Sequence, residues 1–247
     1  MTVLVAAALC AQAGCVASKY RLAKQNTPPV QRLDVAFSPT ASLQSSLTAL
    51  IIDRGPGSWK REALWDEYVL TVTNPGEQRL TIESASLLDP ADTAYAAGTD
   101  PWALEKQSRM LEKQYRARGQ AFVRSVGPGM LIVGAGAAPI AAGGVFSAGA
   151  AAAATAVVIV LPVYYLSVVG INHHNKKAVV AEFTRRRLPL PLALAPGETQ
   201  TLSVFFPMVR SPRSLTLQWS NDAGHGSCAL SLDFLKALHV PAAPSKP

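Results

Sequence analysis

Hydrophobic and polar residues alternate in two separated parts of the chain, and a period of two predicts β-strands. The first part contains alternating runs at 33–38 and 68–73, a more apolar run at 43–52, and a run rich in Thr and Ile at 79–88. The tetrapeptide Asn74-Pro75-Gly76-Glu77 between two of these runs has the composition of a hairpin turn. This part is therefore predicted to form short antiparallel strands.

The same pattern returns near the C-terminus. Pro196-Gly197-Glu198 predicts a turn before a strand at 201–206, and residues 214–220 alternate between polar residues and Leu or Trp. The loop 221–226 precedes a last strand, in which one face carries Cys228, Leu230, Leu232 and Phe234. Short alternating strands with frequent turns are typical of an antiparallel β-sandwich.

Two longer segments have a familiar pattern. YVLTVTNPGEQRLTI and LAPGETQTLSVFF resemble segments of the immunoglobulin-like sandwiches found in many secreted and envelope proteins. The resemblance is one of general pattern and not of one family. It implies a mainly β fold, an antiparallel immunoglobulin-like β-sandwich formed by residues 32–99 and 186–236 and interrupted by an α-helical insertion.

The insertion, predicted at 100–185, begins with a polar helix. Asp100 is suited to the N-cap and Pro101 to the first helical position, and apolar residues then recur near helical spacing to residue 124. Two pairs of opposite charge stand four residues apart, Glu105 with Arg109 and Glu112 with Arg116. The excess of Lys and Arg fits either a solvated amphipathic helix or a helix lying against anionic headgroups.

Residues 129–170 contain no charged residue. As one helix they would extend about 63 Å, about twice the thickness of the hydrocarbon core of a bilayer. We therefore predict an apolar helical hairpin at 129–171 that enters a membrane. A hairpin also brings the chain back to the side of the membrane from which it entered. This is required if the strands before and after the insertion form one sandwich. The alternative is an Ala- and Gly-rich hairpin buried within the protein or an oligomer.

The N-terminal segment 2–14 is short, apolar and rich in small residues, and it is followed by a cysteine. The run Ala13-Gly14-Cys15 resembles the processing site of bacterial lipoproteins. This resemblance covers about the first fifteen residues, and it implies a signal peptide at 1–14 and acylation of Cys15. It also implies a location in the outer membrane, because Val16 stands directly after the cysteine, where an Asp would imply retention in the inner membrane.

Two features depart from the lipoprotein pattern: Gln12 occupies a position where aliphatic residues are preferred, and no basic residue follows Met1 directly. The residues alone also fit a short buried helix, or a plain secretory signal cleaved near Ala13. The segment 15–31 is polar and contains two prolines, so we interpret it as a tether.

The charge composition indicates which classes of partner the protein can bind. The formal net charge is +7, from 23 basic and 16 acidic residues, yet no stripe of Lys and Arg interleaved with aromatic residues is present. We therefore expect anionic lipid or envelope polymer as the electrostatic partner, and no nucleic acid. Among three cysteines only Cys228 lies in the body of the chain, and its register predicts a buried core thiol and not a nucleophile.

The sequence offers no convincing catalytic, cofactor-binding or metal site. His173-His174 are interpreted as an interfacial anchor, His225 lies in a predicted turn, and His239 falls in a predicted disordered tail at 237–247. The loop 53–67 carries two tryptophans, which either cap the core, the favoured interpretation, or form a recognition surface.

These observations predict a lipid-anchored protein of the bacterial envelope, of scaffold or partner-binding type, with a membrane-inserting helical hairpin. It would face the periplasm, with the outer membrane favoured over the inner membrane. Its expected partners are membrane lipid and an envelope protein or a second copy of itself, and we expect no enzymatic activity. The alternative function is that of an oligomeric membrane-active component, a subunit of a pore or of a transport or secretion complex.

Overall fold

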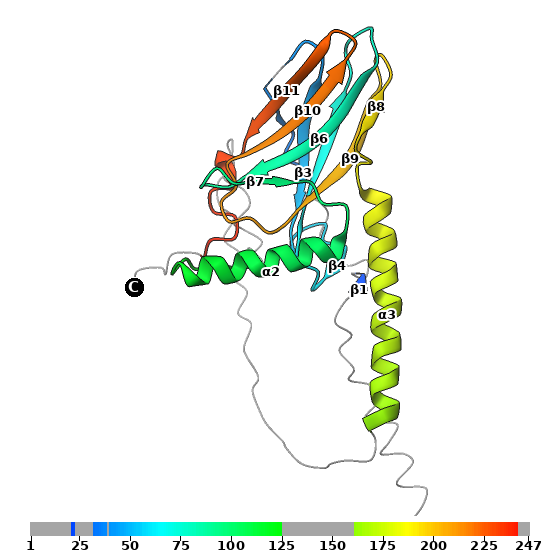
Figure 1. Ribbon diagram of the computed structural model, residues 1–247, viewed down its shortest axis with the longest axis vertical. Helices are drawn as coiled ribbons and strands as arrows, with labels where there is room; N and C mark the ends of the chain where they lie inside the picture. The colour runs from blue at the N-terminus through cyan, green and yellow to red at the C-terminus, as the bar shows by residue number, and fades with distance from the viewer. Residues whose placement is uncertain (1–20, 23–31, 39, 125–160, 242–247) are drawn as a thin grey trace, which may run out of the picture.

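A computed structural model describes residues 21–22, 32–38, 40–124 and 161–241. In these residues two antiparallel sheets pack face to face in a β-sandwich-like arrangement (Figure 1). The first sheet has the order β2-β3-β5-β9, and its strands are β2 (Val35–Ala36), β3 (Gln44–Ile51), β5 (Asp66–Thr73) and β9 (Thr199–Phe206).

The second sheet has the order β11-β10-β6-β7, and β8 also pairs with β6. Its strands are β6 (Leu80–Leu88), β7 (Ala94–Ala96), β8 (Leu192–Leu194), β10 (Ser214–Asn221) and β11 (Gly224–Ser231). Along β6, β8 pairs with the first residues and β7 with the last, while β10 pairs with the whole strand. The two short strands β7 and β8 therefore share one edge of β6.

Strands from both sides of the insertion pair directly with one another. β5 pairs with β9, with Tyr68 opposite Val204, and β6 pairs with β10, with Leu87 opposite Leu215. The prediction of a mainly β chain with antiparallel sheets is confirmed. The central strands of the first part need those of the second part as neighbours.

The alternating positions of the strands bury one side chain in two, as their sequence predicts. Leu70 and Val72 of β5 and Leu217 of β10 are at most 1% exposed and belong to one hydrophobic cluster between the sheets. Cys228 lies in the same cluster, so the prediction of a buried thiol is confirmed. Burial raises the pKa of this thiol, which keeps it protonated.

The polar helix of the insertion is α2 (Pro101–Ala117), and it begins as predicted. The Asp100 side chain accepts a hydrogen bond from the backbone N–H of Trp102. The helix ends before residue 124 because Gly119 adopts a left-handed conformation with φ of 68°. The N–H of Gly119 then donates to Arg116 O and that of Gln120 to Tyr115 O, which is a Schellman termination.

The second helix, α3 (Leu161–Arg186), runs past the end of the sandwich (Figure 1). It includes the last residues of the predicted apolar hairpin and continues through His173-His174 to the basic residues at its C-terminal end. The remaining hairpin residues, 129–160, lie outside the described residues. In the described ranges, no helix combines the length and the apolar character that a membrane crossing needs.

The C-terminal segment differs from its prediction. β11 ends at Ser231, and a short 3₁₀ helix follows at Asp233–Leu235. The predicted tail at 237–247 is wrong for residues 237–241, because Leu238 is 2% exposed and His239 is fully buried. Residues 242–247 lie outside the described part. Residues 237–241 are held by contacts to positions far away in the sequence, such as those of His239 to Asp66 and Val123, which the local sequence does not indicate.

Candidate functional site

One end of the sandwich is closed by the helices and by the loop between β3 and β5 (Figure 1). This loop contains β4 (Lys60–Arg61), which pairs with β1 (Arg21–Leu22), and β1 also contacts α3. A second hydrophobic cluster lies here and joins the loop, α2, α3 and β9: Trp59, Ala63, Trp65, Leu104, Val179, Phe183 and Phe205.

The tryptophans of this loop face inward. Trp65 is fully buried and Trp59 is 8% exposed, so the core-capping interpretation is confirmed and the recognition-loop interpretation is not. Phe183 of α3 stacks on Phe205 at a ring-centroid distance of 4.2 Å and meets the Trp65 ring edge-on at 5.7 Å. The C-terminal part of α3 is therefore fixed to the sandwich by aromatic packing.

Fully buried charged side chains stand at the start of β5, beside the aromatic cluster. Asp66 and Glu67 are neighbours in the strand, and both are 0% exposed. Buried carboxylates require charged or hydrogen-bonding partners. Asp66 is linked through His239 to Val123, before the insertion, and Glu67 to Arg186 at the end of α3, so the two ends of the insertion are connected to the same point of the sheet.

Asp66 is bonded to His239. The Nε2 of His239 lies 2.8 Å from Asp66 Oδ2, and its Nδ1 lies 2.9 Å from the carbonyl oxygen of Val123. A carbonyl oxygen can only accept, so His239 donates its Nδ1–H to Val123, and the two ring nitrogens link the Asp66 carboxylate to the chain at Val123.

The same contact fixes the residue at which the insertion leaves the domain. The backbone N–H of Val123 donates to His239 O at 3.2 Å, which closes a reciprocal pair of bonds between the two residues. The ring of Phe122 stacks on His239 at 5.3 Å. Val123 is therefore held through His239 to β5, close to the point at which the insertion leaves the sandwich.

Glu67 holds the other end of the insertion. Its Oε1 accepts a hydrogen bond from Ser203 Oγ at 2.6 Å and lies 3.4 Å from Arg186 Nη1, at the last residue of α3. Its Oε2 accepts a hydrogen bond from the indole N–H of Trp59. Adjacent residues of β5 therefore anchor the two ends of the insertion.

Lys60 is the third fully buried charged residue of this end. Its Nζ donates to the carbonyl oxygens of Trp65 and Ala63 at 2.7 and 3.1 Å, and it lies 4.9 Å from the centroid of the Trp65 ring. Burial lowers the pKa of Lys60, and the carboxylates around it oppose this effect. Through these hydrogen bonds Lys60 holds the loop folded against the second cluster.

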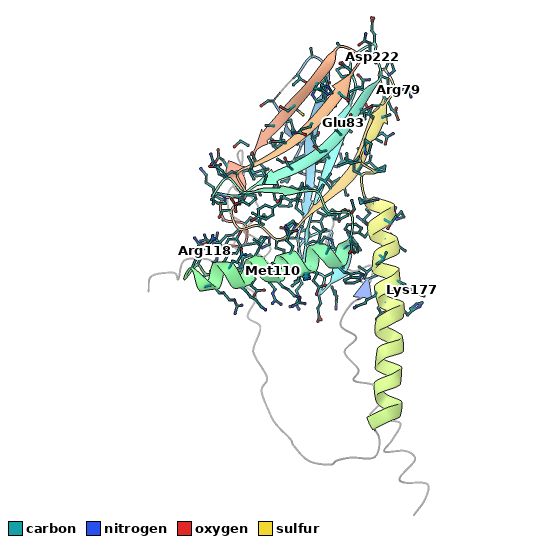
Figure 2. All side chains as sticks on the ribbon, viewed as in Figure 1. Arg79, Glu83, Met110, Arg118, Lys177 and Asp222 are labelled. Carbon is teal, nitrogen blue, oxygen red and sulfur yellow. The ribbon has the colours of Figure 1, made fainter. Side chains whose placement is uncertain are left out.

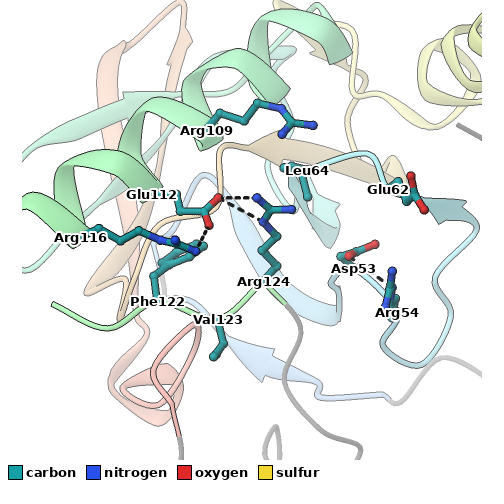
Figure 3. A pocket seen from close by; sticks show the side chains of 10 residues that line it. All are labelled: Asp53, Arg54, Glu62, Leu64, Arg109, Glu112, Arg116, Phe122, Val123 and Arg124. Carbon is teal, nitrogen blue, oxygen red and sulfur yellow. Dashed lines mark hydrogen bonds and ion pairs between the residues drawn. The ribbon is translucent and has the colours of Figure 1, made fainter. Parts of the chain in front are cut away.

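A pocket of about 680 Å³ opens between α2, the loop after β3 and the segment that follows α2 (Figure 3). Glu112 is at its centre and binds two guanidinium groups, Arg116 at 2.7 Å and Arg124 at 2.9 Å. On the opposite wall Asp53 is 4% exposed, and burial raises its pKa. The remaining lining residues are Arg54, Glu62, Leu64, Arg109, Phe122 and Val123.

This lining is suited to binding charged groups. Guanidinium groups and carboxylates dominate it, and the residues that line it include no Ser, Thr, Cys, His or Lys. The buried His239–Asp66 pair does not line the pocket. In the described ranges, no group of three His, Cys, Asp or Glu residues is placed to hold a metal ion.

The residues singled out in the sequence are not brought together. Cys15 lies outside the described residues, His174 and His225 are exposed at separate places, and Cys228 is in the main core. The buried charges at 60, 66, 67 and 239 were not anticipated. The consecutive acids Asp66-Glu67 at the start of an apolar strand were the signal available for two of them.

The ion pairs at the C-terminal end of α3 predict a defined pH dependence. A hydrogen bond from Arg185, assisted by Arg186, lowers the pKa of Glu182 from 4.5 to about 2. The contribution of Glu182 to stability is therefore present above about pH 4.5 and is lost as the pH falls towards 2. Because Arg185 is largely exposed, we expect less than about 1 kcal/mol.

Urea unfolding of the wild type and of Glu182→Gln between pH 2 and 6 measures this contribution. The difference between the two proteins should be constant at the upper end and should vanish near pH 2. Glu77→Gln, which removes an exposed carboxylate in a turn, is the control and should show no such trend. A pH-independent difference for Glu182→Gln would contradict the assignment.

Comparison with known proteins gives no relative for this chain: no protein family, no curated protein and no solved structure matches it.

Proposed function

We propose that this chain is a lipid-anchored protein of the bacterial envelope that acts as a scaffold. In this proposal the sandwich, of immunoglobulin-like type, presents a binding surface to an envelope partner. Cys15 carries the lipid, and residues 129–171 enter a membrane as a helical hairpin. The pocket lined by arginines and carboxylates is the candidate contact for the partner.

The observation that carries the proposal is the common position of three chain connections. The segment that follows the proposed lipid site reaches the domain at β1, beside β4 and α3. The insertion leaves after Arg124, next to α2, and returns through α3. All three connections are at the end of the sandwich that the helices cover (Figure 1). A lipid and a hairpin attached there can reach one membrane without crossing the domain.

The position of α3 along this end supports the proposal. Lys176 lies 5.1 Å from the centroid of the Trp102 ring in the first turn of α2, which fixes the level at which the two helices meet. The α3 residues before this level, 161–175, contain no charged side chain. As a helix they extend about 22 Å beyond α2, which is a suitable depth for entry into the hydrocarbon region of a bilayer.

Acylation of Cys15 is the direct test. Mass spectrometry of the mature protein should find a lipid-modified cysteine at its N-terminus, and Cys15→Ala should abolish the modification. Cys10→Ala, in the predicted signal peptide, is the matched control and should leave it intact. A mature protein that begins at an unmodified residue would refute the lipid anchor.

A further inference from the structure

We propose that the exposed face of α2 is a docking surface for anionic lipid headgroups, and that the domain rests on the membrane through it. This inference deepens the proposed function and rests on it. The docking face is defined by Lys106, Met110 and Lys113 of α2.

The charges of α2 are segregated by burial in a way that the sequence does not reveal. Its two acidic residues, Glu105 and Glu112, are only 6% and 7% exposed. Each is turned towards the domain and paired with arginine, at 2.6 and 2.7 Å. The charged side chains of α2 that are exposed are all basic. The acids therefore pair with Arg109 and Arg116 along the side of the helix that meets the domain, whereas Lys106 and Lys113 are on the exposed side.

A hydrophobic side chain lies in the middle of this basic face. Met110 is 52% exposed and stands four residues after Lys106 and three before Lys113, which places the three on one side of the helix. Within the described part of the chain, Met110 and Leu22 are the exposed large hydrophobic residues. Leu22 belongs to β1, so both are at the same end of the molecule.

A basic face with an exposed hydrophobic side chain in its middle is better suited to a layer of lipid headgroups than to bulk water. Lysine side chains can extend their ammonium groups to phosphates while an apolar side chain between them enters the acyl boundary. Figure 2 labels Met110 in the middle of α2, at the end of the sandwich that the helices cover. The far end of the sandwich, where Figure 2 labels Arg79, Glu83 and Asp222, carries charges of both signs.

The orientation of the two helices agrees with the assignment. α2 lies across the end of the sandwich, and α3 passes it and continues beyond it (Figure 1). If α2 rests on the headgroups, His173-His174 of α3 lie at the level of the interface and the uncharged residues 161–171 lie at the depth of the membrane. One placement of the domain therefore satisfies both helices.

The test uses the full-length acylated protein reconstituted in bilayer nanodiscs. A fluorophore on Met110→Cys reports contact with the bilayer through quenching by lipids that carry a nitroxide on the headgroup. The buried Cys228 does not compete for the label. The same fluorophore on Asp222→Cys, at the opposite end of the sandwich, is the control for position.

We expect quenching at position 110, and not at 222, in bilayers that contain phosphatidylglycerol. Because each basic side chain at an anionic surface contributes about fivefold to binding, Lys113→Glu should shift the docking equilibrium by about 25-fold. Arg79→Glu, the same change of charge on the far end, should leave it unchanged. Quenching at 110 should be weak in bilayers of phosphatidylcholine alone.

The outcomes separate the two proposals. Equal quenching at 110 in both lipids, or no effect of Lys113→Glu, overturns the assignment to anionic headgroups. A protein that enters the nanodiscs but shows no quenching at 110 overturns the docking face, and the proposed function stands. A protein that does not associate with nanodiscs at all contradicts the proposed function itself.

Discussion

Replacing Phe183 with Ala is expected to lower the free energy of unfolding by about 3–5 kcal/mol. Phe183 is fully buried, stacks on Phe205 and meets the edge of Trp65, so the substitution leaves a cavity bordered by two aromatic rings. These contacts also fix α3 to the sandwich. We therefore expect the variant to expose Trp65 before the sheets unfold, which tryptophan fluorescence and circular dichroism measured during urea unfolding would separate.

Thr184→Ala is the matched control because Thr184 is the next residue of the helix and is exposed. Its effect should remain within about 0.5 kcal/mol. If Phe183→Ala is as stable as the control, α3 is not packed on the second cluster. The fixed position of α3, on which the membrane placement depends, would then be lost.

Replacing His239 with Phe is the second substitution with a large expected effect. The new ring can still stack on Phe122, but it offers no donor to Asp66 or to Val123 O. Asp66 has no hydrogen-bond partner for its Oδ1 among the described residues, so the substitution removes the donor on which this buried carboxylate depends. Removing one partner of a buried pair costs about 3–5 kcal/mol, measurable as a lower urea midpoint.

Two further variants test the cause. His225→Phe changes an exposed histidine of β11 and should have little effect on stability. In the double variant Asp66→Asn/His239→Phe, the loss should be smaller than the sum of the two single losses, because the unpaired charge is absent. Full additivity would show that the two side chains do not interact, and an unchanged His239→Phe would show that residues 237–241 are not docked.

The strands of the sandwich could be predicted because apolar and polar residues alternate in them over a few consecutive positions. The strand predicted from Tyr68, Leu70 and Val72 is β5, and the clean alternation of 214–220 is β10. The start of α2 was predictable for the same reason, because capping by Asp100 and Pro101 is a local effect. Its end depends on the left-handed conformation of Gly119, which is a weaker local signal than the apolar spacing that continues to residue 124.

The buried charges could not be predicted in the same way. Asp66 and Glu67 are recognisable as acids in a strand, but their burial depends on His239 and Ser203, which come after the insertion. Lys60 lies in a loop whose composition is typical of an exposed segment. Lys60 is buried because the loop folds over Trp65, and no hydrophobic periodicity in the sequence predicts this loop conformation.

The pairing of β5 with β9 and of β6 with β10 also constrains the order of events during synthesis. A chain made from its N-terminus presents β3, β5 and β6 first, with one hydrogen-bonding edge of β5 and the β10 edge of β6 still open. Strands whose partners are distant in sequence fold slowly, because a long loop must close first. Residues 125–160 are therefore synthesised before either sheet is complete. If they enter a bilayer, they do so beside an unfinished domain, and closure by β9 and β10 is the step that fixes the domain over its membrane segment.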